Sequence, residues 1–175
     1  MNIVVQLIGG LGIIANVISF QCKSHNRILL FKTLNELIFA VQYFLLGAYT
    51  GAAVNIIGVV RNVVFTKQIE NNKKTTITAI IFSVLFCIFG LFFWQGSRSI
   101  LIIVAKVLST LAYGNKNTAI MRGIILTTSV SWLIYNYRVC SVAGFLCEAL
   151  TLISLIIGII RLDIIPLLSV KARLK

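Results

Sequence analysis

Apolar residues recur along this chain in stretches long enough to cross a lipid bilayer, with short polar connections between them. A transmembrane helix needs about 20 residues, and backbone groups in lipid must be hydrogen-bonded within their own helix. The pattern therefore predicts an all-α membrane protein. Its seven expected transmembrane helices cover residues 3–20, 28–46, 51–66, 76–94, 99–113, 119–137 and 141–160.

The composition supports this interpretation. Of the 175 residues, 59% are hydrophobic and only 11% are charged, with a mean hydropathy of +1.00. A water-soluble domain needs a polar coat and could not hide this much apolar surface in one core. The first stretch lacks a positively charged start and an Ala-x-Ala-like cleavage site, so we interpret it as a retained helix.

Positive charge falls mainly in alternate connections. The side opposite the N-terminus carries most of the basic residues, whereas the other side carries only Arg98 and Arg138. Because basic loops stay in the cytoplasm, this asymmetry predicts an N-terminus outside and a C-terminus inside. The net charge of +12 is then explained by orientation and by contacts with membrane lipids. We expect no nucleic acid partner.

Nothing in the sequence indicates an enzyme, a metal site or a cofactor. The four cysteines, Cys22, Cys87, Cys140 and Cys147, form no C-x-x-C pair, and we expect them to be packing residues. The only histidine, His25, lies in a short basic connection. The chain therefore lacks the residue sets of a zinc site or a catalytic triad.

An internal repeat relates the two halves of the chain. A shift of 93 positions aligns residues 20–61 with 113–154 without a gap, and it pairs Asn55 with Glu148. A competing shift of 100 aligns 56–61 with 156–161 better locally but requires a gap, so we prefer 93. Parallel repeats of this kind are typical of transporters. The predicted units are a first three-helix bundle (1–66), a basic cytoplasmic loop with a linker helix (67–98), a second three-helix bundle (99–161) and a basic cytoplasmic tail (162–175).

Two stretches carry a family resemblance: residues 42–55 with Arg61 downstream, and residues 131–136 followed by Gly144 and Glu148. Together with the 3+1+3 helix plan, they resemble the SWEET/PQ-loop superfamily of small-solute transporters. The chain is more closely similar to the YgjV family, which implies a multi-pass protein of the bacterial inner (plasma) membrane. SWEET and PQ-loop proteins have a proline in the first helix of each bundle, but the only proline here is Pro166. This difference favours either a less hinged motion or no transport cycle.

Charged side chains at membrane depth cost about 2.5–3.5 kcal/mol each on insertion scales, so they need partners or water. Glu36, Lys106 and Glu148 are predicted at this depth. We interpret them as lining a central cavity that holds a solute or a coupling proton. The alternative is a static ion pair between helices. Arg61 is expected to extend toward the cytoplasmic headgroups instead.

The resemblance adds Asn55 to these candidates. SWEET-type proteins have one polar residue on the third helix of each bundle, and the two face each other across the solute. The matching positions here are Asn55 and Glu148, so a glutamate replaces the usual second asparagine. This change favours a polar or cationic solute, or proton linkage, over a neutral sugar.

Trp132 and Asn136 lie one helical turn apart and would share a helix face. They could stack on and hydrogen-bond a ring-bearing solute, or they could pack within the core. Gln42 and Tyr43 are their weaker counterparts in the first half. The function we expect is a small-solute transporter with its site between the bundles. Assembly into a homo-oligomer is compatible with the sequence. The alternatives are a non-transporting receptor-like or substrate-capturing subunit, and a lipid-handling protein.

Overall fold

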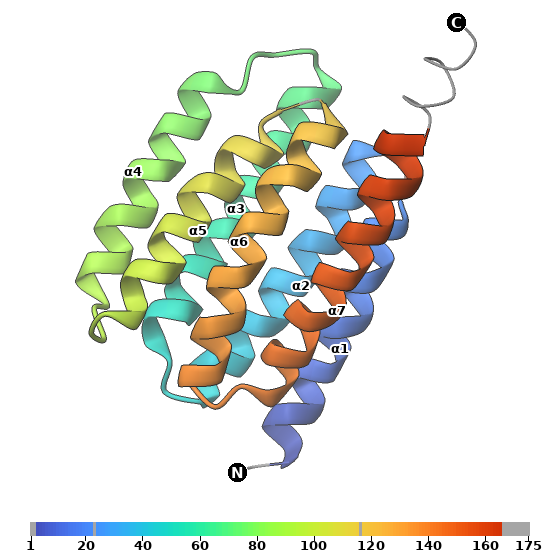
Figure 1. The fold of residues 1–175 in the computed structure, drawn as a ribbon. Coiled ribbons are helices and arrows are strands. Elements are labelled where there is room, and N and C mark those ends of the chain that lie inside the picture. The colour runs from blue at the N-terminus through green and yellow to red at the C-terminus, as the bar shows by residue number, and fades with distance from the viewer. Residues whose placement is uncertain (1–2, 23, 116, 166–175) are drawn as a thin grey trace, which may run out of the picture.

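The computed structural model describes residues 3–22, 24–115 and 117–165, and these residues form an all-helical fold (Figure 1). A short π-helix, η1 (Ile160–Ile164), continues the last α-helix. The seven α-helices are α1 (Ile3–Gln21), α2 (His25–Leu45), α3 (Tyr49–Glu70), α4 (Thr76–Phe92), α5 (Arg98–Tyr113), α6 (Thr118–Arg138) and α7 (Val142–Ile159).

The surface of this fold suits a lipid environment. Among the described residues, three helical segments are long and apolar enough to cross a membrane: His25–Leu45, Thr118–Arg138 and Val142–Ile164. Two shorter apolar helices cover Ile3–Ser19 and Thr76–Phe92. Large apolar side chains on these helices, such as Leu7, Leu37, Ile77, Phe92 and Ile153, are exposed. Soluble monomers rarely expose so continuous an apolar surface.

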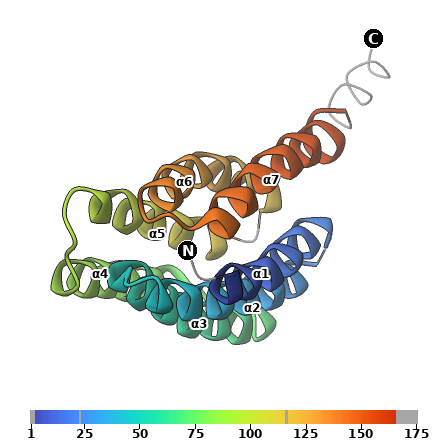
Figure 2. The ribbon, with the colours of Figure 1, turned by 90° about the horizontal axis from the view of Figure 1, so that it is seen from below.

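The helices pack in two layers. Figure 2 shows α1, α2, α3 and α4 in one layer and α5, α6 and α7 in the other. Neighbours in sequence pack against each other within the sets α1–α3 and α5–α7. Contacts of α1 with α7 and of α3 with α5 join the two layers, and α4 packs against α3 and α5 at the edge. Six helices thus surround a central region, with α4 outside it.

The 93-residue shift found in the sequence also relates the helices. It takes α2 (His25–Leu45) onto α6 (Thr118–Arg138), with both ends coinciding. The turns that follow α2 and α6 also correspond, because Gly47 and Cys140 both have positive φ angles, of 70° and 55°. In each turn the next residue donates to the carbonyl five residues before it, Ala48 to Tyr43 and Ser141 to Asn136. This agreement favours the shift of 93 over the competing shift of 100.

Most helix ends lie within three residues of the predicted ones, but two helices extend further at their C-terminal ends. α3 continues four residues past 66, to Glu70, whose carboxylate accepts a hydrogen bond from Asn26 Nδ2 at 3.0 Å. α7 and η1 continue the helix through 162–165, where the sequence predicted a tail. There Asp163 forms an ion pair with Arg122 of α6. Polar side chains at these ends stay helical because they find partners on a neighbouring element. Pro166 and the rest of the predicted tail lie outside the described residues.

Candidate functional site

A cavity of about 50 Å³ lies between helices of both layers. One water needs about 10–15 Å³ by this measure, so there is room for about three to five water-sized groups. Side chains from α2, α3, α5, α6 and α7 line it. The lining includes all six candidate residues: Glu36, Asn55, Lys106, Trp132, Asn136 and Glu148.

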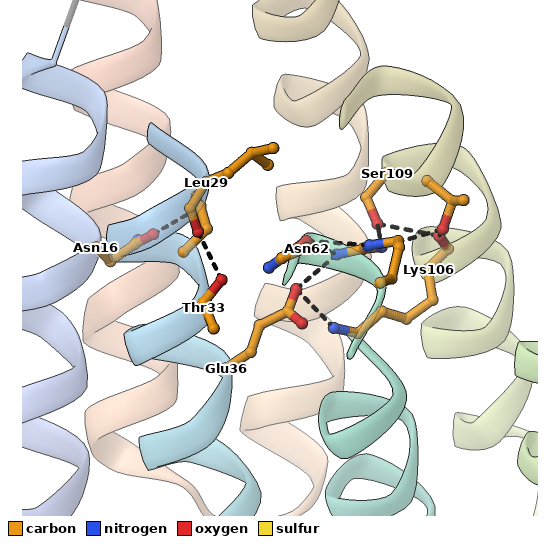
Figure 3. A network of polar contacts seen from close by, with 10 residues as sticks. Asn16, Leu29, Thr33, Glu36, Asn62, Lys106 and Ser109 are labelled. Atoms are coloured by element: carbon orange, nitrogen blue, oxygen red, sulfur yellow. Dashed lines mark hydrogen bonds and ion pairs between the residues drawn. The ribbon is translucent and has the colours of Figure 1, made fainter. Parts of the chain in front are cut away.

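Glu36 pairs with two cationic side chains at one wall of the cavity (Figure 3). Its Oε1 lies 2.8 Å from Arg61 Nη2 and 2.9 Å from Lys106 Nζ. All three residues are buried, and they come from α2, α3 and α5. The cluster therefore joins the two layers through charge-assisted hydrogen bonds, which are the stronger kind.

Arg61 is fully buried, so the prediction that it extends toward the headgroups is wrong. Its Nη1 donates to Thr110 Oγ1 at 3.0 Å and to Ser109 Oγ at 3.3 Å, and its Nε donates to Asn62 Oδ1 at 3.1 Å. The guanidinium also lies 4.9 Å from the centroid of the Tyr113 ring, within cation–π range. Burial is tolerated because a carboxylate on the adjacent helix and several acceptors replace water.

Gly58 on α3 makes room for this ion pair. A Cβ at this position would lie 1.8 Å from Glu36 Oε2 and 2.8 Å from Lys106 Nζ. The carboxylate therefore rests directly against the backbone of α3, an approach that a residue without Cβ permits. Among the described residues, Glu36 Oε2 has no hydrogen-bond partner. Glu36 thus depends on the two cations at its other oxygen.

Glu148 belongs to a second polar group that lines the cavity. Lys32 lines the same cavity, and the charges of Lys32 and Glu148 interact. Ser129 donates a hydrogen bond to Glu148. Lys32 Nζ also donates to Asn16 Oδ1, and Asn16 Nδ2 donates to Thr151 Oγ1. This group joins α1, α2, α6 and α7.

Aromatic rings enclose the cavity near the α2–α3 and α6–α7 turns. Tyr43 donates to Asn136 Oδ1 at 2.6 Å, and the Tyr43 ring stacks on Trp132 at a centroid distance of 6.1 Å. Tyr135 packs edge-on against Tyr43, and its hydroxyl accepts the backbone N–H of Gly51 at 3.1 Å. Tyr43 and Asn136 are 93 residues apart, so this bond joins equivalent positions of the two halves.

A layer of amide and hydroxyl hydrogen bonds closes the adjoining contact between α1, α2 and α7. Gln42 Nε2 donates to Gln6 Oε1 at 3.2 Å, and Ser141 Oγ donates to Gln42 Oε1 at 3.1 Å. The backbone N–H of Ala143 also donates to Gln6 Oε1, at 3.1 Å. These bonds satisfy polar groups that would otherwise be costly in lipid.

Two candidate residues keep their polar groups free. In the described part of the chain, neither the Asn55 amide nor the Trp132 indole N–H has a hydrogen-bond partner, although both residues line the cavity. Asn55 is buried and Trp132 is half-buried, and buried polar groups are normally hydrogen-bonded. These two groups are therefore available to water or to a bound molecule.

The structure thus brings the six candidates together around one cavity, and their role in binding a solute stays a prediction. The alternative of a static ion pair also has support, because Glu36 and Lys106 contact each other. Sequence reasoning missed the roles of Arg61 and Lys32. Lys32 lies four residues before Glu36, so the shared helix face was a usable signal.

The sequence model of one protein family matches residues 3–164 of the chain, and its description is "Imp-YgjV: Bacterial inner membrane protein". No curated protein matches the chain, and no solved structure does.

Proposed function

This chain belongs to the YgjV family of bacterial inner membrane proteins, and from that premise we propose that it is a small-solute membrane transporter. The observation that carries the proposal is the cavity itself. Four ionisable side chains from three helices line it, namely Lys32 and Glu36 of α2, Lys106 of α5 and Glu148 of α7. Ionisable groups inside membrane proteins are costly, and they commonly mark the paths of solutes, ions or protons.

The proposal includes a SWEET-like fold of two parallel three-helix bundles, with α4 as the linker. The coincident ends of α2 and α6 under the 93-residue shift support it, as do the matching turns that follow them. Three helices reverse the chain direction, so one extra span restores the orientation for the second copy. Transporters built from such repeats place the solute at the interface between them. Asn55 and Glu148, the repeat-related pair, both line the cavity.

We place the N-terminus outside and the C-terminus in the cytoplasm, because the basic connections alternate with nearly neutral ones. Ser97 and Asn71 are exposed and lie on opposite sides in this topology. In a variant without the native cysteines, a membrane-impermeant maleimide added outside should label a cysteine at Ser97 and spare one at Asn71. The reverse labelling would overturn the orientation.

Uptake into liposomes that contain this chain alone tests the transport function. We expect saturable uptake of at least one small polar solute from a panel covering anions, neutral amides and amidinium cations. Glu148→Gln should lower the uptake rate about tenfold or more or change its pH dependence, because Lys32 and Ser129 lose their charged partner, whose hydrogen bond is worth about 1.5–3 kcal/mol.

The matched control is Glu70→Gln, the same change at an exposed carboxylate far from the cavity lining. Its uptake should equal that of the unmodified chain. If the unmodified chain takes up no solute from the panel, the transport proposal fails in favour of a receptor-like or substrate-capturing subunit. If Glu148→Gln leaves the rate and its pH dependence unchanged, Glu148 has no part in transport.

A further inference from the structure

The charges around the cavity do not balance. Lys32, Arg61 and Lys106 supply three cationic groups, whereas Glu36 and Glu148 supply two carboxylates. Among the described residues of this cluster, one positive charge is therefore in excess. Excess charge in a low-dielectric interior is costly unless a counter-charge accompanies it.

We propose that the cavity binds a compact monovalent anion, an inference that rests on the transport function proposed above and specifies its solute. The bound anion makes the cluster neutral. The cavity has room for about three to five water-sized groups, which matches a solute with about as many non-hydrogen atoms as acetate.

Hydrogen-bond donors for an anion are present on three helices. The free amide of Asn55 and the free indole N–H of Trp132 line the cavity from α3 and α6. Lys106 of α5 has three N–H donors, and its ion pair with Glu36 uses one of them. Lys106 Nζ also lies 5.5 Å from the centroid of the Trp132 ring, so these two residues border the same part of the cavity.

The structure also removes the reason for expecting a cation. That expectation came from Glu148, taken alone as a negative charge in the site. In the structure, Glu148 interacts with the charge of Lys32 and accepts a hydrogen bond from Ser129. Glu36 forms ion pairs with Arg61 and Lys106. Both carboxylates already have a cationic neighbour, so neither offers an unbalanced charge to a cationic solute.

Trp132 provides a direct test, because the chain has only one other tryptophan, Trp94, which is exposed. In a Trp94→Phe background in lipid nanodiscs, Trp132 fluorescence is titrated with acetate, acetamide and acetamidinium at constant pH and ionic strength. These three probes have nearly the same shape and differ in charge. Acetate should bind about tenfold or more tightly than acetamide, because an ionic hydrogen bond adds about 1.5–3 kcal/mol. Acetamidinium should give no saturable change.

Variants that change the net charge of the cavity test whether its excess positive charge binds the anion. Lys106→Met removes the excess charge and one donor, so acetate binding should weaken about tenfold or more. Adding Glu148→Gln to that variant restores the excess positive charge and should recover part of the affinity for acetate. Glu148→Gln alone should strengthen acetate binding, although it slows transport. Lys67→Met, at an exposed lysine on the last turn of α3, is the control and should change nothing. Size-exclusion chromatography verifies that each variant is folded.

Four outcomes overturn the inference: equal or tighter binding of acetamide, saturable binding of acetamidinium, no saturable binding of acetate, or unchanged acetate binding in Lys106→Met. None of them refutes transport, because a neutral or cationic solute could still be taken up in the liposome assay. Conversely, selective acetate binding without uptake of any solute leaves the anion site in place and refutes the transporter. The two proposals thus fail separately.

Discussion

Replacing Glu36 with leucine should destabilise the protein by about 3–5 kcal/mol, the typical cost of removing one partner from a buried ion pair. The substitution leaves Arg61 and Lys106 without the carboxylate that both contact. These residues are 0% and 2% exposed, so Arg61 cannot recover hydration without a helix movement, and Lys106 reaches only the small cavity. We expect this to be the largest effect of any single substitution at the cavity.

Reversible unfolding in mixed detergent–lipid micelles measures this loss. Glu70→Leu is the matched control, because Glu70 is exposed at the end of α3 and its replacement should change stability by less than about 0.5 kcal/mol. A loss below about 1 kcal/mol for Glu36→Leu is what a solvated, unpaired Glu36 would give. That result would contradict the buried cluster.

Gly58→Ala should also destabilise the protein, by about 1–3 kcal/mol, which is typical of overpacking. The added methyl group would lie 1.8 Å from Glu36 Oε2, so the carboxylate must move away from its two cations. Helix propensity alone predicts the opposite sign, since alanine is favoured over glycine by about 1 kcal/mol in a helix. The direction of the change therefore separates the two effects.

Gly10 is the matched control for Gly58, because a Cβ there meets nothing within 4 Å. Gly10→Ala should be neutral or stabilising in the same unfolding assay. In a Glu36→Ala background the carboxylate is absent, so Gly58→Ala should lose most of its cost; this coupling is measured by a double-mutant cycle. Equal effects of Gly58→Ala in both backgrounds would show that the glycine does not accommodate Glu36.

Much of the helix plan could be predicted from the apolar stretches alone. The predicted stretch 119–137 lies within one residue of α6 at each end, and the predicted start of α4 is correct. The end of α3 was predicted too early because Lys67, Gln68 and Glu70 are typical of a polar connection. A helix can, however, extend past the hydrocarbon core into the headgroups. Composition marks where a helix leaves the lipid, and this is a different position from the helix end.

The candidate site followed from two signals: the cost of charge at membrane depth and the repeat that pairs Asn55 with Glu148. The sequence did not predict which side chains the charged residues contact. In a membrane protein, both the lipid-facing surface and the helix contacts are apolar, so the hydrophobic pattern says little about how each helix is rotated. Arg61 was therefore assigned to the headgroups by depth alone. Lys32 was not among the candidate residues, although its place one turn from Glu36 pointed to the cavity.

The central claim is that α2, α3, α5, α6 and α7 enclose a polar cavity that holds a solute, and an experimental density map tests it most directly. The map would come from full-length protein crystallised in a lipid phase with acetate, at a resolution that shows ordered solvent. We predict non-protein density within hydrogen-bond distance of the Asn55 amide and Lys106 Nζ, with Glu36 still paired to Arg61. A map with Glu36 and Lys106 facing lipid, or with apolar side chains filling the space between the helices, would contradict the account.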